Sequence, residues 1–365
     1  MSDPTQNRTD APYQFHAFEV SYFSAKVRPA LRYKGLWVDE RRADLGEIMR
    51  RTGLGFIPIV VTPEGETWQD SSDIYRKLEA RHPEPPLFPA TPLQRVAAHL
   101  VEIYANEFAL IPAMHYRWGS ELGEASARAR FSAMIGSVEI GNKAADRMAK
   151  ARFVVGAAPE AAAEIEAHTA ELLAALSAHF EAHPYLLGAR QSFADCALMG
   201  PIDGHFFCDL VSRRLLLETA IPVVGWLERC KFPNADAQGE WLASDALAPT
   251  LVETLSAMGR DAVPMILDLL RAFEAWADER GPDVVEPPRG IGACETSLRG
   301  VPVKRGIMAY TLFSVQQVLD YLGTLDAGER AAVETALAST GWTELLAYTP
   351  RHRLAKDGFK LVFEG

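Results

Sequence analysis

The stretch that decides the fold is Gly55–Ile74, which reads GFIPIVVTPEGETWQDSSDI. A proline opens its apolar β-branched run, a position where a strand loses no ladder hydrogen bond. Turn residues at 63–65 separate this run from a second short strand at 66–69. Asp70 and Ser71 are good helix N-cap residues, and apolar side chains follow them at helical spacing. The stretch therefore predicts strand, turn, strand and helix.

This layout predicts a binding surface for a small extended peptide. The position of Pro58 is compatible with a cis Ile57–Pro58 bond, and the backbone there would face open space, so that a ligand can pair with Ile57 as an added strand. Free N–H groups at the start of the next helix attract a carboxylate, while Asp70 can accept a hydrogen bond from an ammonium. The alternative is that Pro58 only begins a strand and that Asp70 and Ser71 only cap a helix.

Composition narrows the class of protein. The chain has 365 residues, of which 48% are apolar, and this length suggests two or three domains. A net charge of −11 argues against a nucleic-acid-binding surface. The four cysteines are widely spread without metal-type spacing, which indicates a reducing compartment and no metal site. We find no signal-peptide or membrane-spanning pattern, so we expect a soluble cytoplasmic protein that does not bind membranes.

The residues before this stretch predict the other half of a small α/β domain. A strand at 13–20 leads into a helix introduced by Ser21–Ser24, and a second strand is expected at 36–42. A short helix at 44–52 follows. The predicted element order is therefore β-α-β-α-β-β-α, which resembles a thioredoxin-like domain.

Three sequence features extend this resemblance to a family. Ser-Tyr-Phe-Ser-Ala-Lys-Val-Arg at 21–28, the Ile57–Pro58 pair, and Asp70-Ser71 shortly before Ile74 resemble the N-terminal domain of cytosolic glutathione transferases. Tyr22 departs from the pattern, because the family often has proline there.

A second resemblance to the same family lies further along the chain. Pro184–Gly188 followed by the capping box Ser192–Asp195 resembles the start of the central helix in the family's C-terminal domain, and we interpret this box as structural. Five prolines between 83 and 92 form a stiff linker before it. The two resemblances together cover about residues 13–230.

The remaining residues, 245–365, predict a small α+β extension. We expect helices at 246–258 and 262–279, a hairpin around Gly300, and a final hairpin turning at Asp357-Gly358. The expected protein is thus an α+β multidomain chain. Its expected parts are a disordered lead-in at 1–12, a thioredoxin-like glutathione-binding domain at 13–82, an all-helical domain at 91–233 and the extension at 245–365.

Ser21 is the candidate catalytic residue. At the start of a helix its hydroxyl can donate to a sulfur atom, and the helix dipole favours a thiolate. Lowering a thiol pKa from about 8.5 makes it a nucleophile at neutral pH. In serine-type glutathione transferases the catalytic serine stands six positions before the Val of Val-Arg, which here is Ser21. Plain N-capping is the alternative role of Ser21, and Ser24 could share or take the catalytic role.

The pocket for a second substrate is predicted less directly. Aromatic and basic residues follow a helix end near position 115, although packing and capping are the alternative explanation for them. The candidate pocket residues are Tyr22, Ser24, His115 and Trp118.

The resemblance implies a glutathione transferase that adds the glutathione thiolate to a small apolar electrophile. Glutathione, the co-substrate, would lie along Ile57 and Pro58 with its γ-glutamyl end on Asp70 and Ser71. The alternative is a non-catalytic glutathione-transferase-like binding or scaffold protein that has kept the fold.

The family also implies a homodimer formed through helices equivalent to those at 71–81 and 91–114. The second of these has more apolar surface than one buried stripe requires. Its apolar residues surround the cylinder, and they are Val96, Leu100, Ile103, Tyr104, Phe108 and Leu110. The alternative is that the extension covers this face within one chain.

Overall fold

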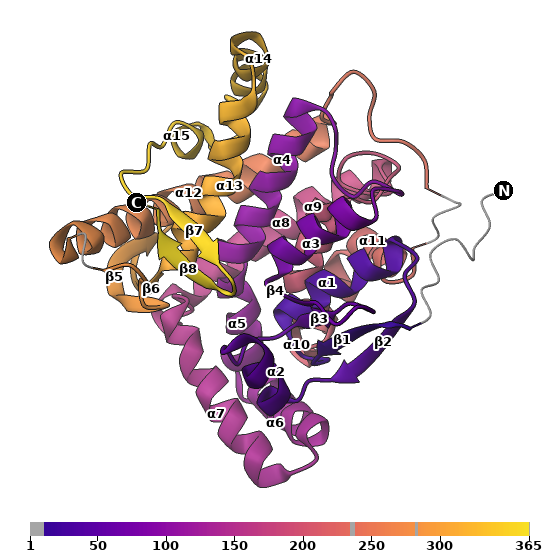
Figure 1. Cartoon of the computed structure of the whole chain (residues 1–365), viewed down its shortest axis with the longest axis vertical. Helices are drawn as coiled ribbons and strands as arrows, with labels where there is room; N and C mark the ends of the chain where they lie inside the picture. The colour runs from indigo at the N-terminus through magenta and orange to yellow at the C-terminus, as the bar shows by residue number, and fades with distance from the viewer. Residues whose placement is uncertain (1–10, 234–237, 282–283, 365) are drawn as a thin grey trace.

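A four-stranded mixed sheet organises the N-terminal part of the chain (Figure 1). The computed structural model describes residues 11–233, 238–281 and 284–364, so nearly all of the predicted lead-in lies outside the described residues. The sheet order is β2-β1-β3-β4, with β1 parallel to β2 and antiparallel to β3. The strands are β1 Tyr13–Ala17, β2 Val38–Arg42, β3 Ile59–Val61 and β4 Thr67–Gln69.

Three helices complete this domain and confirm the predicted thioredoxin-like order. They are α1 Tyr22–Tyr33, α2 Leu45–Thr52 and α3 Ser71–Arg81. Each begins behind a polar N-cap whose side chain accepts backbone N–H bonds, namely Ser21, Asp44 and Asp70. The Ile57–Pro58 peptide bond is cis.

The middle of the chain is all helical, as expected. Its elements are α4 Pro92–Ile103, the π-helical turn η1 Tyr104–Phe108, α5 Leu110–Trp118, α6 Glu121–Ile135, α7 Val138–Val154, η2 Pro159–Ala161, α8 Ala162–Ala182, α9 Phe193–Pro201, the π-helical turn η3 Ile202–Phe207, α10 Leu210–Thr219 and α11 Ile221–Lys231. The capping box at the start of α9 is present, and the buried Asp195 carboxylate also accepts a hydrogen bond of 2.9 Å from the Trp226 indole. This carboxylate therefore fixes the start of α9 against α11.

The extension contains a long helix and two separate hairpins. Its elements are α12 Pro249–Arg280, β5 Gly290–Leu298, β6 Val301–Met308, α13 Ala309–Thr324, α14 Ala327–Leu337, α15 Thr343–Leu346, β7 Leu354–Asp357 and β8 Lys360–Phe363. Both predicted hairpins form. The prediction of two helices between 246 and 279 is wrong, because α12 runs through Gly259 without a break. A Cβ at Gly259 would lie 2.4 Å from the Thr340 carbonyl oxygen, so this glycine allows close packing of the extension.

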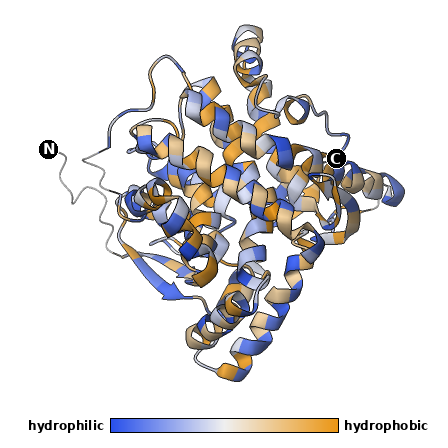
Figure 2. Ribbon diagram, turned by 180° about the vertical axis from the view of Figure 1, so that it is seen from behind, coloured by the Kyte–Doolittle hydropathy of each residue, from blue (hydrophilic) through white to orange (hydrophobic). Residues whose placement is uncertain are grey.

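The extension packs along α4 of the helical domain. Helices α13 and α14 both contact α4, and Figure 1 shows α13 beside it. The backbone N–H groups of Leu93 and Gln94 donate to the Asp245 carboxylate, so a residue ahead of α12 caps the start of α4. Hydrophobic residues gather in the central helices, whereas the edge strand β2 is mainly hydrophilic (Figure 2). None of the helices in the described part is long and apolar enough to cross a membrane.

The apolar face of α4 that suggested a homodimer is covered within the single chain. Val96, Leu100, Ile103, Tyr104 and Phe108 are all buried, and Leu110 is half-buried. The excess apolar surface is therefore explained by the extension, which was the alternative, and it no longer argues for a second subunit.

Candidate functional site

The loop before β3 presents a free backbone edge. The Gln69 side chain donates a 2.7 Å hydrogen bond to the Phe56 carbonyl and so holds this loop against β4. Among the described residues, none hydrogen-bonds the N–H or C=O of Ile57. Ile57 is half-buried, and Pro58 behind it is buried. The edge can therefore accept an extended ligand by strand addition.

Asp70 and Ser71 lie at the N-terminus of α3, beside this loop. Asp70 has a φ of 79°, a left-handed conformation that is uncommon outside glycine. Its Oδ1 accepts from the backbone N–H groups of Ser72 at 2.9 Å and Asp73 at 3.2 Å. The Ser71 hydroxyl has no partner among the described residues. The largely buried N-terminus of α3 is therefore polarised for an anionic group.

Ser21 lies at the N-terminus of α1 with its hydroxyl hydrogen available. Its Oγ accepts from the Ser24 N–H at 3.2 Å, and no described residue accepts a hydrogen bond from this hydroxyl. Ser24 is completely buried, and its hydroxyl accepts from the Phe18 N–H. Of the two serines, only Ser21 retains exposed surface.

A buried arginine that the sequence did not single out fixes the loop before Ser21. Arg117 donates to the Val20 carbonyl at 3.1 Å and to the Asp209 carboxylate at 2.7 Å. Burial lowers the pKa of Arg117, while the charge of Asp209 acts to raise it. The sequence shows that Arg117 lies among aromatic and basic residues at the end of a helix. Its hydrogen-bond partners, Val20 and Asp209, lie in distant segments of the chain.

A buried polar network attaches the start of α3 to α4. The Ser72 hydroxyl donates to Glu102 at 2.5 Å, and the fully buried Lys26 ammonium donates to Asn106 at 2.5 Å. Burial alone would raise the pKa of Glu102, but His99, Lys26 and Ser72 lower it to about 2. Glu102 therefore stays ionised, and the network fixes the predicted site on the helical domain.

The extension adds three side chains around the predicted glutathione site. The Tyr310 hydroxyl donates to Asp70 Oδ1 at 3.0 Å, and the Lys356 ammonium lies 3.2 Å from Asp70 Oδ2. The Arg289 guanidinium lies over the Phe56 ring, 3.8 Å from its centre. Burial and then the charge of Asp70 raise the pKa of Tyr310 well above its ordinary value, so it remains a donor. No local sequence pattern pointed to these residues.

The predicted second-substrate residues lie mostly in the core. Tyr22 is buried and donates to the Ala105 carbonyl at 2.5 Å, and Trp118 is buried against Phe131. His115 is half-buried and pairs with Glu166 at 3.0 Å. With Ser24 also buried, the prediction of substrate contact is wrong for Tyr22, Ser24 and Trp118, which are core residues, whereas His115 keeps exposed surface and stays a prediction. Within the described ranges no group of three His, Cys, Asp or Glu residues could hold a metal ion.

Comparison with known proteins agrees with this geometry. Residues 15–86 match the model of the glutathione S-transferase N-terminal domain family. This match agrees with the thioredoxin-like sheet, the cis proline before β3 and the capped start of α3. Residues 15–86 therefore form a domain of the glutathione S-transferase N-terminal family, and the rest of the chain lies outside this match.

The solved structures that match the chain share little of its sequence. A glutathione S-transferase from Rhodospirillum rubrum F11 is 17% identical, with 66% of this chain and 99% of that chain covered and a TM-score of 0.42. One from Methylobacterium radiotolerans, solved in complex with glutathione sulfonate, is 19% identical over 65% of this chain and 100% of that chain, with a TM-score of 0.39. The beta-etherase LigF from Sphingobium sp. strain SYK-6 is 17% identical over 62% and 97%, with a TM-score of 0.41. No curated protein matches the chain.

Proposed function

We propose that the chain is a glutathione-dependent transferase that adds the glutathione thiolate to a small apolar electrophile. The observation that carries this proposal is the unpaired backbone of Ile57 just ahead of β3, in the same domain as the capped N-termini of α1 at Ser21 and α3 at Ser71. Glutathione would extend along Ile57 and Pro58, with its γ-glutamyl carboxylate at Ser71 and its sulfur at Ser21. The free cysteines of the described part fit a reducing, cytoplasmic location, which we also propose.

The proposed reaction requires one chemical contribution from the protein, which is stabilisation of the thiolate. Ser21 donates its free hydroxyl hydrogen to the glutathione sulfur and so stabilises the thiolate relative to the thiol. The N-terminus of α1 adds its dipole to this effect. The thiolate then attacks the electrophilic carbon, and the leaving group departs with the bonding electron pair.

A specific observation favours the second candidate, a non-catalytic binding or scaffold protein. Both oxygens of Asp70 already have partners, because Oδ1 accepts from two N–H groups and Tyr310 while Oδ2 pairs with Lys356. An incoming ammonium must therefore displace or share Lys356. This competition lowers the expected affinity for glutathione without removing the rest of the site.

Calorimetric titration with glutathione, together with a turnover assay using 1-chloro-2,4-dinitrobenzene, tests the proposal. Binding with turnover supports the transferase. Binding without turnover for a panel of electrophiles favours the scaffold or a transferase with a narrow substrate, and absence of binding at millimolar glutathione rejects the transferase.

We expect Ser21→Ala to raise the pKa of the bound glutathione thiol and to lower kcat, with little change in glutathione affinity. The hydroxyl interacts chiefly with the thiolate, so its loss affects the chemical step. The thiolate absorbance of bound glutathione, followed against pH, measures the shift.

Ser120→Ala is the matched control for this variant. Ser120 caps α6 by accepting from the Gly123 N–H, just as Ser21 caps α1. Both variants should lose about 1 kcal/mol of stability from the lost cap. A Ser21→Ala protein with the thiol pKa and rate of Ser120→Ala would reject the catalytic role.

We expect the protein to be a monomer in solution. The family implied a homodimer through α3 and α4, but α13 and α14 cover α4 here. Light scattering at micromolar concentration should therefore give a mass near 40.1 kDa. A mass near twice that value would show that a different surface forms the dimer.

A further inference from the structure

The start of α3 carries two acidic side chains, Asp70 and Asp73, and both already have cationic partners within the chain. The Lys356 ammonium lies 3.2 Å from Asp70 Oδ2 and 3.7 Å from Asp73 Oδ2. Asp73 also pairs with Arg76 at 3.6 Å and with Lys77 at 3.8 Å on its own helix. Neither carboxylate therefore lacks a cation before a ligand binds.

The contact between Lys356 and Asp70 is largely shielded from water. The Lys356 side chain is 18% exposed and the Asp70 side chain 16%. The Lys356 ammonium also lies 5.7 Å from the centre of the Phe313 ring, within the range of a cation–π contact. Two charges in such a site attract each other more strongly than they would in bulk water. A second ammonium that displaces Lys356 must therefore replace several contacts.

The hairpin that carries Lys356 is anchored at its base. The Leu354 N–H donates to the Gln316 side chain at 2.9 Å, and the same side chain donates to the Leu354 carbonyl at 3.1 Å. On the other strand, the Phe363 N–H donates to the Val285 carbonyl at 2.9 Å. Leu354 and Phe363 face each other in the hairpin, so both strands are held at the same end. Lys356, two residues along β7, is thus placed by the fold of the extension.

The anion-binding groups at the start of α3 remain free. The Ser71 hydroxyl has no partner among the described residues, although this residue is only 5% exposed. Ser71 is the first residue of α3, where backbone N–H groups and the helix dipole attract a carboxylate. The site can therefore accept a ligand carboxylate, whereas its acceptor for a ligand ammonium is occupied.

Attachment of the extension is the simpler role of Lys356. The first turn of α13 already attaches the extension nearby, because Thr311 donates to the buried Glu107 at 2.7 Å and Tyr310 donates to Asp70 Oδ1 at 3.0 Å. Lys356 is thus one attachment among several. Its ammonium occupies the oxygen of Asp70 that a ligand ammonium would need, so the same contact that attaches the extension also affects ligand choice.

We propose that the site prefers a thiol peptide that resembles glutathione but lacks the γ-glutamyl ammonium group. The ligand carboxylate would bind at Ser71 and its thiol at Ser21, while Lys356 would stay on Asp70. Glutathione itself brings an ammonium that either displaces Lys356 or enters without an acidic partner, and both outcomes lower its affinity. This inference rests on the proposed transferase function and names the class of thiol that the same site prefers.

Competitive calorimetric titration with glutathione and glutaryl-cysteinylglycine tests the proposal. The second peptide is glutathione with its α-ammonium group replaced by hydrogen, so the two ligands differ only at that group. We expect glutaryl-cysteinylglycine to bind the wild type about tenfold more tightly, because it buries no unpaired ammonium. The order of affinities should reverse in Lys356→Met, where Asp70 becomes available to the ammonium of glutathione.

Lys356→Arg and Lys360→Met are the matched variants. Lys356→Arg keeps a cation beside Asp70, so it should keep the wild-type preference if charge is the cause. Lys360→Met removes a lysine of the same hairpin that pairs with the exposed Glu286, and it should change neither affinity. Thermal unfolding confirms that each variant is folded.

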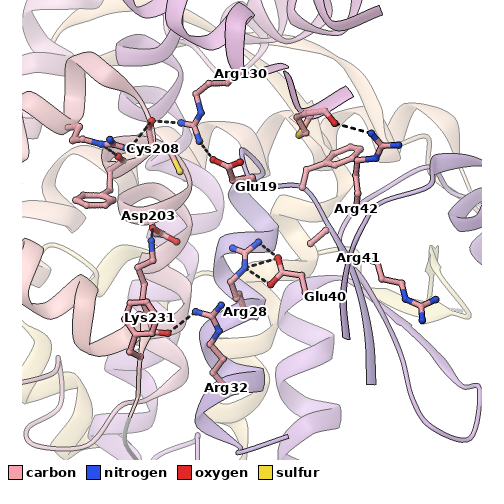
Figure 3. A pocket seen from close by; sticks show the side chains of 16 residues that line it. Glu19, Arg28, Arg32, Glu40, Arg41, Arg42, Arg130, Asp203, Cys208 and Lys231 are labelled. Atoms are coloured by element: carbon pink, nitrogen blue, oxygen red, sulfur yellow. Dashed lines mark hydrogen bonds and ion pairs between the residues drawn. The ribbon is translucent and has the colours of Figure 1, made fainter. Parts of the chain in front are cut away.

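A different place where an anionic peptide could bind is the cavity of about 670 Å³ shown in Figure 3. Arg28 and Arg32 are among its lining residues, whereas Ser21, Ser71 and Lys356 are not. Arg32→Gln removes one of these guanidinium groups and should leave both affinities unchanged. A preference that disappears in Arg32→Gln and persists in Lys356→Met would place the peptide in this cavity and overturn the proposal.

The other outcomes separate this inference from the proposed function. If glutathione binds the wild type as tightly as glutaryl-cysteinylglycine, or more tightly, the inference is wrong and the transferase proposal stands. An unchanged preference in Lys356→Met also overturns the inference, because Lys356 is then not its cause. Absence of binding by both peptides rejects the proposed function and this inference together.

Discussion

Replacement of Asp261 by alanine is expected to lower the free energy of unfolding by about 3 kcal/mol. Asp261 belongs to α12 of the extension, and its buried Oδ2 accepts from His168 Nδ1 at 2.8 Å and from Arg299 Nε at 2.9 Å. His168 in turn lies 2.7 Å from the Tyr104 hydroxyl of the helical domain. Removing the carboxylate leaves a buried imidazole and a guanidinium without their shared partner.

The pH dependence of this contribution follows from the pKa of Asp261. Burial alone would raise this pKa, but hydrogen bonds from His168, Arg299 and Arg260 lower it below its ordinary value. A carboxylate with a lowered folded-state pKa stabilises the protein above its unfolded value of about 3.9, and this stabilisation is lost as the pH falls through the folded-state pKa. The difference between wild type and variant should therefore stay constant from about pH 6 to about pH 8.

Glu253→Ala on the same helix is the control for Asp261→Ala. Glu253 is exposed, so its loss should change stability by less than about 0.5 kcal/mol. Urea denaturation of the three proteins gives the comparison. Equal stability of the Asp261 and Glu253 variants would show that the network does not hold the extension on the helical domain.

Two substitutions at the Asp70–Lys356 pair are expected to change glutathione affinity in opposite directions. Asp70→Asn keeps an oxygen that caps α3 but removes the charge that receives the ligand ammonium, so the Kd should rise about tenfold or more. Lys356→Met removes the cation that lies 3.2 Å from Asp70 Oδ2, so the Kd should fall about tenfold. Calorimetric titration measures both.

The stability of Lys356→Met provides an independent readout. Without glutathione the variant should melt at a lower temperature, because Asp70 loses a partner within a partly buried site. Saturating glutathione should then raise its melting temperature by more than it raises that of the wild type.

Lys360→Met is the matched control, since Lys360 lies on the adjacent strand β8 and pairs with the exposed Glu286. It should leave glutathione affinity unchanged. If Lys356→Met instead weakens binding, Lys356 contacts a ligand carboxylate and does not compete with the ammonium.

The sequence by itself determined the fold of the N-terminal domain and located the free backbone edge at Ile57. The signals in Gly55–Ile74 are local, because a proline, a turn and a helix cap restrict the backbone within a few residues. The capping box at Ser192–Asp195 was readable for the same reason. Ser21, Ile57 and Asp70 could therefore be named as candidates before the structure was known.

Only the tertiary structure decided what surrounds those residues. Tyr310 hydrogen-bonds Asp70 although the two residues are 240 positions apart in the sequence. Arg289 and Lys356, which contact Phe56 and Asp70, belong to two other parts of the extension. The continuity of α12 and the burial of α4 both depend on how the extension packs. Gly259 lets the Thr340 carbonyl approach α12 closely, although in the sequence alone this glycine indicated the end of a helix. Such contacts form between segments that are far apart in the sequence and are brought together by tertiary packing. Hydrophobic periodicity and capping residues within a short window therefore cannot predict them.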